Sequence, residues 1–276
     1  MLQTISLSNL PIGKIVSLKN KDWLKKQKYA GKILGNLHKE LFLIIKGLAT
    51  NISLSDLDRF SFDYIKNHNC IPTFLNYYGF PSSICASINK ELVHGFGNRK
   101  IILKPGDVIK IDIGVTFEEA IADCAVTYIY GKPKSDNILN LLLSCQNALN
   151  QSIKVVKPGN RIGAIGSEIY RIGKENNFGV ITNYGGHGID YNTLHAAPFI
   201  PNKSKSEDGI IIQPGLSIAI EPMFVLNNNI NTKVLSDKWT VVTQDIGAHF
   251  EHSITLDEEG NIHIITEHGI SVKDFR

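Results

Sequence analysis

Apolar residues recur at helical spacing through the first quarter of the chain. From residue 20 to 47 they fall three and four positions apart, and Asn20 or Asp22 can cap the start. A second such pattern begins at Ser53, a suitable N-cap. The sequence therefore predicts a long amphipathic helix over 20–47 and a shorter one over 53–67.

Patterns typical of strands follow, and then helical spacing returns. Residues 108–115 and 120–130 are rich in β-branched and aromatic side chains and flank a polar tip at 116–119, which predicts a β-hairpin. Helices are predicted over 135–156 and, after a Lys-Pro-Gly turn, up to about residue 177. Further strands are predicted at 84–88, 179–183, 216–224, 239–243, 251–256 and 261–265. The order of elements is similar in both halves, which suggests internal pseudo-symmetry within one domain.

Composition narrows the class of protein. The chain has 276 residues, 43% of them hydrophobic, and a net charge of +3, which fits a globular protein and excludes disorder, a coiled coil and a collagen-like fibre. This balance argues against nucleic acid as the main ligand. No apolar run approaches the roughly 20 residues that span a bilayer, and the N-terminus lacks a signal-peptide pattern. We therefore expect a cytoplasmic protein without a membrane partner.

Two carboxylates stand inside the apolar strands of the predicted hairpin. Asp112 lies within 109–115 and Asp123 within 120–126, although Asp is depleted in strands and costly in a core. A four-residue tip would place Asp112 directly opposite Asp123, with Cβ atoms roughly 5 Å apart. A carboxylate that caps a loop would explain one of them, but it explains both poorly. Two like charges this close require a cation between them or a shared proton.

Three further residues have the same unusual character. His187 is flanked by glycines, while Glu221 and Glu251 lie in apolar strands. With the two aspartates they make five candidate ligands, four of them anionic, which balances two divalent ions and suits Mn, Fe(II), Co or Zn. Two such ions can activate a bridging water for hydrolysis. The other histidines outside this region are expected to be surface or satisfied core residues, namely His38, His68, His249, His252, His263 and His268.

Short motifs spread over nearly the whole chain beyond residue 20 carry a family resemblance. They run in the family's order and are 77–81, 85–89, 93–95, 104–107, 111–112, Asp123, 185–189, His195, Gly215, 220–223, 237–240 and 250–252. With these motifs the sequence resembles the type I methionine aminopeptidases, metallopeptidases of peptidase family M24, in their short bacterial form. The resemblance implies an α/β (α+β) pita-bread fold, in which pseudo-twofold halves of helices pack on a curved, mainly antiparallel β-sheet. A single catalytic domain would span 1–276, with 1–19 as an N-terminal extension.

The resemblance also implies roles for individual residues. Two divalent ions (Co, Mn, Fe(II) or Zn) would be held by Asp112, Asp123, His187, Glu221 and Glu251. Glu221 would also exchange protons with the bridging water, and His94 and His195 would contact the substrate around the scissile amide. A thioether needs an apolar, polarizable slot, and besides the two histidines the expected lining residues are Tyr77, Phe80, Cys85, Leu194 and Trp239.

The implied activity is removal of the initiator methionine from the N-termini of nascent polypeptides when the second residue is small. The enzyme would be a cytoplasmic monomer without a nucleic-acid cofactor, and its action on nascent chains leaves a transient contact with the ribosome possible. One alternative is an Xaa-Pro aminopeptidase or prolidase-like hydrolase, although such enzymes usually carry an additional N-terminal domain. The other is a non-catalytic pita-bread binding module, which the complete ligand set disfavours.

The segment between His187 and His195 departs from the family pattern. It is one residue longer than the common bacterial spacing, and Asp190 replaces a usual glycine. Leu194 and Ala196 stand where related enzymes often have an aromatic and an acidic residue. We therefore expect a reshaped loop at the lip of the pocket.

Overall fold

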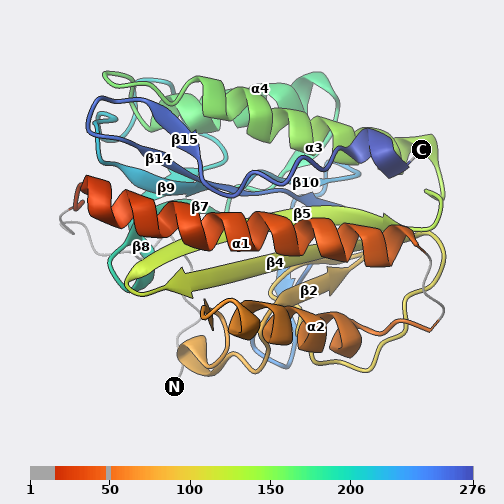
Figure 1. Cartoon of the computed structure of the whole chain (residues 1–276). Helices are drawn as coiled ribbons and strands as arrows, with labels where there is room; N and C mark the ends of the chain where they lie inside the picture. The colour runs from red at the N-terminus through yellow and green to blue at the C-terminus, as the bar shows by residue number, and fades with distance from the viewer. Residues whose placement is uncertain (1–15, 48–50, 276) are drawn as a thin grey trace.

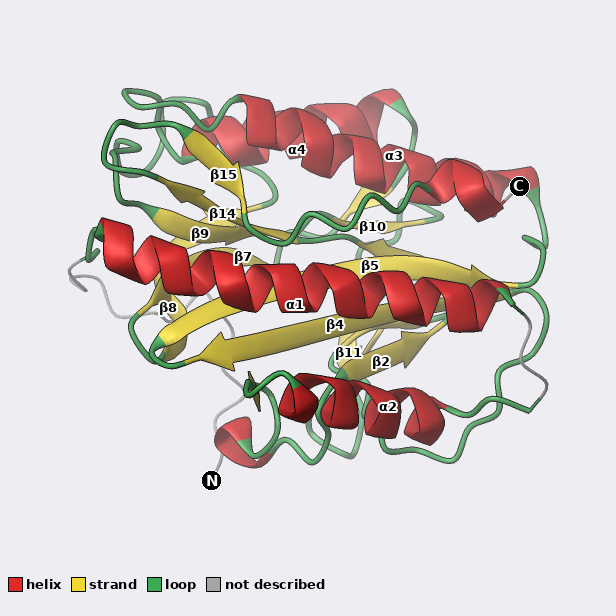
Figure 2. Cartoon of the chain, viewed as in Figure 1, coloured by secondary structure: helices red, strands yellow, loops and turns green. Residues whose placement is uncertain are grey.

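The computed structural model describes residues 16–47 and 51–275, which form a mixed α/β architecture (Figures 1 and 2). Residues 1–15, most of the predicted N-terminal extension, lie outside the described residues. The helices are α1 (Lys21–Lys46), α2 (Leu54–Asn67), α3 (Asp136–Lys154) and α4 (Gly163–Glu175), with short 3₁₀ helices at Tyr77–Gly79 and Val272–Phe275. Within the described residues no helix is long and apolar enough to cross a membrane.

Capping side chains explain where the predicted helices begin. Asn20 Oδ1 accepts the Trp23 backbone N–H at 2.9 Å and starts α1. Ser53 and Asp56 form a reciprocal capping box at the start of α2. Ser135 caps α3 in the same way as Asn20 caps α1. All four helices were predicted, and their observed ends differ from the predicted ones by a few residues. For α4 the difference lies at its start, since the helix begins at Gly163 rather than directly after the turn at 157–159.

The strands pair antiparallel in four sheets, which confirms the mainly antiparallel fold that the family resemblance implied. One sheet contains β1 (Ile71–Pro72), β2 (Cys85–Ile88), β4 (Asp107–Phe117) and β5 (Ala120–Tyr130). The largest joins β7 (Gly185–Asp190), β8 (Thr193–Pro201), β9 (Ser217–Ile220), β14 (His252–Leu256) and β15 (Ile262–Ile264). Two smaller sheets have three strands each. One contains β6 (Gly179–Val180), β10 (Met223–Val225) and β13 (Gly247–His249), and the other contains β3 (Glu91–Val93), β11 (Lys233–Val234) and β12 (Val241–Val242).

The helices divide between the two halves of the molecule. Figure 1 shows α1 lying along β4 and β5, α2 beside β2, and α3 with α4 over the second set of strands. This arrangement agrees with the two similar halves expected from the order of elements. The strands lie between the helices, so the long apolar faces of β4 and β5 are buried against α1.

The β4–β5 hairpin has a tighter turn than predicted, and this corrects the register. Phe117 pairs with Ala120, so the turn contains only Glu118 and Glu119 rather than four residues. Asp123 consequently opposes Gly114, and Asp112 is therefore not directly opposite it. The shift is two residues and side chains alternate with period two, so both carboxylates still share one face. They are diagonal neighbours across the hairpin.

The hairpin of β7 and β8 was missed from the sequence. Its glycines are typical of loops and Pro198 is typical of a strand end, yet β8 continues through that proline. The glycines are needed for close backbone approach: a Cβ on Gly186 would lie 2.1 Å from Ala219 O, and one on Gly188 1.9 Å from Ala197 O. The strand predicted at 216–224 is in turn split into β9 and β10 around 221–222.

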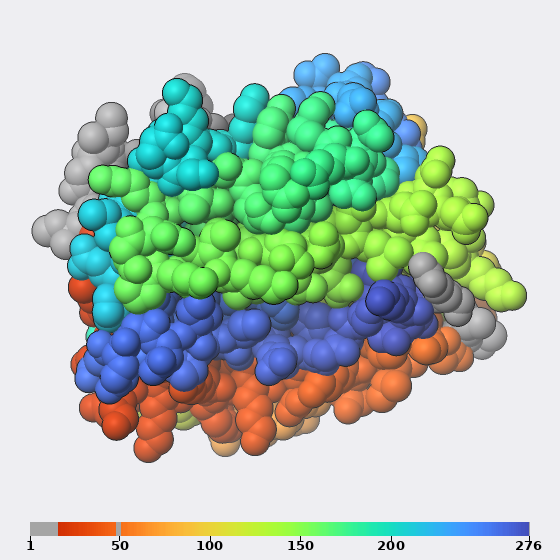
Figure 3. Space-filling view, turned by 90° about the horizontal axis from the view of Figure 1, so that it is seen from above, coloured from red at the N-terminus to blue at the C-terminus, as the bar shows by residue number. Residues whose placement is uncertain are grey.

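The C-terminal segment, residues 265–275, packs between the two halves of the molecule. Viewed from above, it lies between α1 and the α3–α4 pair (Figure 3). A Cβ on Gly31 or Gly35 of α1 would lie within 2.4 Å of backbone oxygens of residues 265 and 267. On the other side, the Gln146 side chain of α3 donates to Ile270 O at 2.9 Å. The segment therefore contacts both halves.

Candidate metal centre

The carboxylates of the β4–β5 hairpin lie side by side. Asp123 is 3% exposed, and Asp112 is its diagonal neighbour across the hairpin. Burial, followed by the charges of Asp123 and Glu221, raises the pKa of Asp112 well above its usual range. Burial also raises the pKa of Asp123, although His187 opposes this. The pair is therefore held together against its own repulsion.

His187 is oriented as a ligand from β7. It is 1% exposed, and its Nδ1 lies 3.0 Å from Gly188 O, which holds a proton on Nδ1 and leaves Nε2 as the nitrogen that faces the carboxylates. Nε2 lies 3.5 Å from Asp123 Oδ2 and 4.0 Å from Glu221 Oε1. In the absence of an ion, burial lowers the pKa of His187, but the Asp123 hydrogen bond and the charge of Glu221 outweigh it and raise the pKa.

The second half of the chain contributes Glu221, after β9, and Glu251, between β13 and β14. Glu251 is 2% exposed, and its N–H donates to Ala125 O of β5 at 2.8 Å. Ser253 Oγ accepts the Asp123 N–H at 2.7 Å and donates to Asp123 O at 2.8 Å. These bonds bring Glu251 to Asp123: ligand atoms of Asp123, His187 and Glu251 lie within 4.8 Å of one another.

Several oxygens of this cluster have no hydrogen-bond partner among the described residues. They are Asp112 Oδ1, Asp123 Oδ1 and Glu251 Oε1, all buried. Burial and the charges of Asp123 and Glu221 raise the pKa of Glu251 well above its usual range. Unpaired buried carboxylate oxygens are rare in proteins, and a divalent cation satisfies them. The donor set, oxygens with one imidazole, fits such an ion.

Two histidines flank this cluster and are half-buried, so they remain accessible. His94 follows β3 and has a positive φ of 60°, a strained conformation for a side chain of this kind. Burial and the nearby His249 lower the pKa of His94 to about 4. His195, on β8, packs edge-on against the His187 ring with centroids 4.5 Å apart. Burial and the neighbouring His187 lower the pKa of His195 well below its usual range.

The five side chains predicted to line a methionine pocket belong to one apolar cluster: Tyr77, Phe80, Cys85, Leu194 and Trp239. Phe80 packs edge-on against Trp239 with ring centroids 5.2 Å apart. Tyr77 Oη lies 3.1 Å from His195 Nδ1, and the His94 ring is 6.4 Å from that of Trp239. The cluster therefore adjoins both histidines. Its binding of a methionine side chain stays a prediction.

His249 is not the surface or satisfied core residue that the sequence predicted. It lies on β13, is 1% exposed, and its Nε2 is 3.3 Å from Glu221 Oε2. Neither ring nitrogen makes a hydrogen bond within the part of the chain that the structure describes. The signal in the sequence was its position two residues before Glu251, which places both side chains on one face of an extended segment.

The segment between His187 and His195 is the β7–β8 turn, held by the residues before α1. Lys19 Nζ lies 2.7 Å from Asp190 Oδ1, and the Ser17 hydroxyl also contacts that carboxylate. Lys19 further packs over the ring of Tyr191, 5.1 Å from its centroid. Burial opposes ionisation of Asp190, but Lys19 and Ser17 lower its pKa overall. The aspartate that departs from the family pattern is therefore an anchor for the turn.

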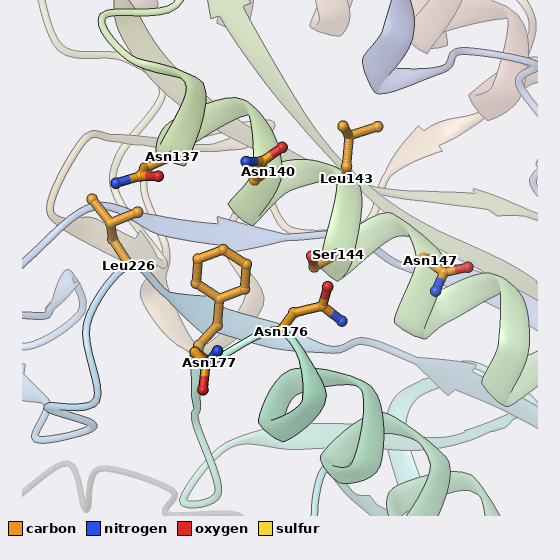
Figure 4. A pocket seen from close by; sticks show the side chains of 9 residues that line it. Asn137, Asn140, Leu143, Ser144, Asn147, Asn176, Asn177 and Leu226 are labelled. Atoms are coloured by element: carbon orange, nitrogen blue, oxygen red, sulfur yellow. The ribbon is translucent and has the colours of Figure 1, made fainter.

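Two other features are less suited to chemistry. On the opposite face of β5, Cys124, His252 and His268 are buried together, but Cys124 Sγ donates to Glu251 O, His252 Nδ1 contacts Thr266 Oγ1, and His268 Nδ1 accepts from Ile270 N–H. An open depression over α3 is lined by Asn137, Asn140, Leu143, Ser144, Asn147, Asn176, Asn177, Phe178 and Leu226 (Figure 4). None of these lining side chains is charged.

Comparison with known proteins identifies the family. The sequence pattern of metallopeptidase family M24 matches residues 25–258. A methionine aminopeptidase of Mycoplasma capricolum is 39% identical over 248 residues, which cover 89% of this chain and 96% of that protein. The crystal structure of methionine aminopeptidase from Rickettsia prowazekii superimposes with a TM-score of 0.86 at 30% identity, covering 91% of this chain and 100% of that one.

A prolidase from Pyrococcus furiosus shares the fold alone. Its TM-score is 0.68 at 17% identity, and the match covers 90% of this chain but 65% of the prolidase. The longer prolidase chain agrees with the expectation that Xaa-Pro peptidases carry additional sequence. The profile match, the relatives and the buried carboxylate cluster agree with one another: the chain belongs to metallopeptidase family M24.

Proposed function

We propose that this protein is a methionine aminopeptidase that removes the N-terminal methionine from peptides and nascent polypeptides with a small second residue. The observation that carries the proposal is the buried cluster of Asp112, Asp123, Glu251 and His187, whose unpaired oxygens adjoin an apolar cluster of side chains. Relatives of 39% identity bear that name over nearly their whole length. The reaction would be hydrolysis of the first peptide bond.

Asp112, Asp123, His187, Glu221 and Glu251 would hold two divalent ions, of which Co, Mn, Fe(II) and Zn all suit the donors. Such ions, when bound, lower the pKa of water and polarise the scissile carbonyl. Four carboxylates match the charge of two divalent ions. Glu221 is the least enclosed carboxylate that touches His187, and its side chain is 12% exposed. This partial exposure supports a role for Glu221 as the general base and acid that exchanges a proton with water.

His195 and His94 would contact the substrate around the scissile amide. Burial and the charge of Tyr78 raise the pKa of Tyr77 to about 12, so its phenol stays protonated and would donate to His195 Nδ1, 3.1 Å away. The lowered pKa of His195 keeps the ring neutral. A neutral ring that accepts at Nδ1 carries its proton on Nε2. His195 therefore has an Nε2–H available to donate to a substrate carbonyl, and His94 is likewise neutral at pH 7.

The pocket would select the side chain of the first residue. Phe80, Trp239 and Cys85 offer aromatic faces and a sulfur, which favour contact with a thioether. The protein would act in the cytoplasm as a monomer on the N-termini of nascent chains, and transient contact with the ribosome is compatible with that role.

The proposal is tested with metal-free protein reconstituted with Mn²⁺ or Co²⁺. We expect release of methionine from Met-Ala-Ser, no cleavage of Ala-Pro-Ala, and no activity of Asp112→Ala on either peptide. Cleavage of the proline peptide alone would indicate an Xaa-Pro peptidase instead. Metal binding without cleavage of either peptide would indicate a binding module, and undiminished activity of Asp112→Ala would remove the metal centre from the reaction.

A further inference from the structure

His249 is a buried ring beside the candidate metal ligands, and both of its nitrogens are left without hydrogen-bond partners among the described residues. It is 1% exposed, and neither Nδ1 nor Nε2 makes a hydrogen bond among the described residues. The nearest carboxylate oxygen to the ring is Glu221 Oε2, 3.3 Å from Nε2. Leaving a buried ring nitrogen unpaired is unfavourable, because the group loses its hydrogen bonds to water without gaining others. Such a residue requires an explanation beyond packing.

The backbone holds this ring in place. The His249 N–H donates to Thr127 Oγ1 at 2.9 Å, and the Thr127 hydroxyl donates to His249 O at 2.5 Å. On its other side His249 pairs with Met223, two residues after Glu221. The strand that carries Glu221 and the strand that carries His249 are therefore fixed to each other. The ring faces Glu221 because of this register, rather than by a chance rotamer.

The two oxygens of Glu221 face different partners. Oε2 lies toward His249, while Oε1 lies 4.0 Å from Nε2 of His187, the ring that faces Asp123. A hydrogen bond to one carboxylate oxygen restricts rotation and aims the other oxygen. The other charged and titratable groups that face His249 are Asp123 and His94.

We propose that His249 is a positioning residue: its Nε2–H donates to Glu221 Oε2 and so directs Oε1 toward the divalent ions. This inference rests on the proposed function in that it takes Glu221 as a metal ligand. His249 itself touches neither substrate nor ion, and it acts through Glu221.

Metal binding by the metal-free protein tests this without any peptide. We compare His249→Leu, which removes the donor, with His249→Gln, whose amide reaches as far, and His249→Asn, whose amide is one methylene shorter. Titration calorimetry with Mn²⁺ should give an affinity for at least one ion about 10- to 100-fold weaker in the Leu and Asn variants. His249→Gln should recover most of the loss. His263→Leu, which breaks an imidazole contact with Asp257 of 2.9 Å at a remote turn, is the matched control and should bind as wild type.

With Met-Ala-Ser the Leu variant should lose kcat more than it raises KM, because the altered group positions Glu221 rather than substrate. Wild-type Mn²⁺ affinity in His249→Leu, or equal affinity in the Asn and Gln variants with unchanged unfolding of the metal-free proteins, would overturn the inference. If the Leu variant does not fold, the Asn and Gln pair decides alone. Failure of wild-type protein to release methionine would defeat only the proposed activity, since the titration requires no substrate.

Discussion

A buried carboxylate without a counter-ion destabilises the protein that contains it. Asp112 lies beside Asp123 and is affected by Glu221, and its Oδ1 has no partner among the described residues. In the metal-free protein these groups repel one another, and bound cations turn the same groups into attractive partners. Stability without metal and stability with metal therefore respond in opposite directions to removal of one charge.

We predict that Asp112→Asn raises the Tm of the metal-free protein by a few degrees at pH 7.5, because 1 kcal/mol corresponds to about 2–4 °C in a domain approaching this size. The same variant should lose most of the increase in Tm that Mn²⁺ gives to wild type. Calorimetric scans with EDTA and with Mn²⁺ measure both effects. Asp63→Asn, at an exposed position, serves as control. A lower Tm of Asp112→Asn in EDTA would contradict the prediction.

The residues of the candidate metal centre differ in how readily the sequence identifies them. Asp112 and Asp123 stand out because charges are rare in apolar strands, and Glu221 and Glu251 are identified by the same argument. His249 is not identified in this way because a buried histidine usually finds a hydrogen bond inside the core, as His38 does with Tyr128. Only the three-dimensional register of β10 and β13 places it against Glu221.

At the scale of elements, the β7–β8 hairpin supplies both His187 and His195. Its strands lie unusually close because glycines face the neighbouring backbone, and a Cβ at Gly188 would lie only 1.9 Å from Ala197 O. The hydrogen-bonded turn at Asp190 fixes the far end of the hairpin. The proposed metal ligand His187 and the proposed substrate-contacting His195 therefore depend on the same hairpin backbone.

We predict that Gly188→Ala pushes β7 from β8 and costs about 1–3 kcal/mol in unfolding free energy, as other overpacked sites do. It should also weaken Mn²⁺ binding, because His187 is the adjacent residue. Urea unfolding of the metal-free protein and metal titration measure the two effects. Thr193→Ala, at the exposed start of β8, should change stability by no more than about 0.5 kcal/mol. Equal effects of the two substitutions would show that the close approach is unimportant.

Elements also differ in how well the sequence predicts them, because some depend on local signals and others on contacts between residues far apart in the chain. Helices α1, α2 and α3 are predictable because an apolar stripe and a capping side chain are both local. The face shared by Asp112 and Asp123 is predictable because alternation is local, whereas the register is not, since a two-residue and a four-residue turn fit the same polar tip. The β7–β8 hairpin is hidden because its glycines serve contacts with residues that lie far along the chain.

At the scale of the whole molecule, the centre forms where the two halves meet. Asp112 and Asp123 come from the first half, and His187, Glu221 and Glu251 come from the second. Hydrogen bonds between β5 and residues 249–253 join the halves directly beside these proposed ligands. Similar element order predicts two halves, but sequence patterns alone do not specify how two sheets meet. Only the family resemblance predicts how the two halves are arranged around the candidate metal centre.

Two buried histidines, His38 on α1 and His268 in the C-terminal segment, make the fold sensitive to acid. Burial and His268 lower the pKa of His38 to about 3, and burial and Lys39 lower that of His268 to about 4. Both rings are neutral when folded and bind protons on unfolding below their usual pKa of about 6.5. Their contribution to stability is therefore present above pH 6.5 and is lost as the pH falls toward these lowered values.

We predict that each of these histidines costs about 2 kcal/mol of stability between pH 6.5 and pH 5, because one pKa unit corresponds to about 1.4 kcal/mol. Urea unfolding in EDTA at the two pH values measures the loss in wild type and in His268→Gln, which removes one titrating ring. The difference between the two proteins isolates this group from the carboxylates of the centre, whose raised pKa values act in the opposite sense. A loss as large in His268→Gln as in wild type would assign the acid sensitivity to other groups.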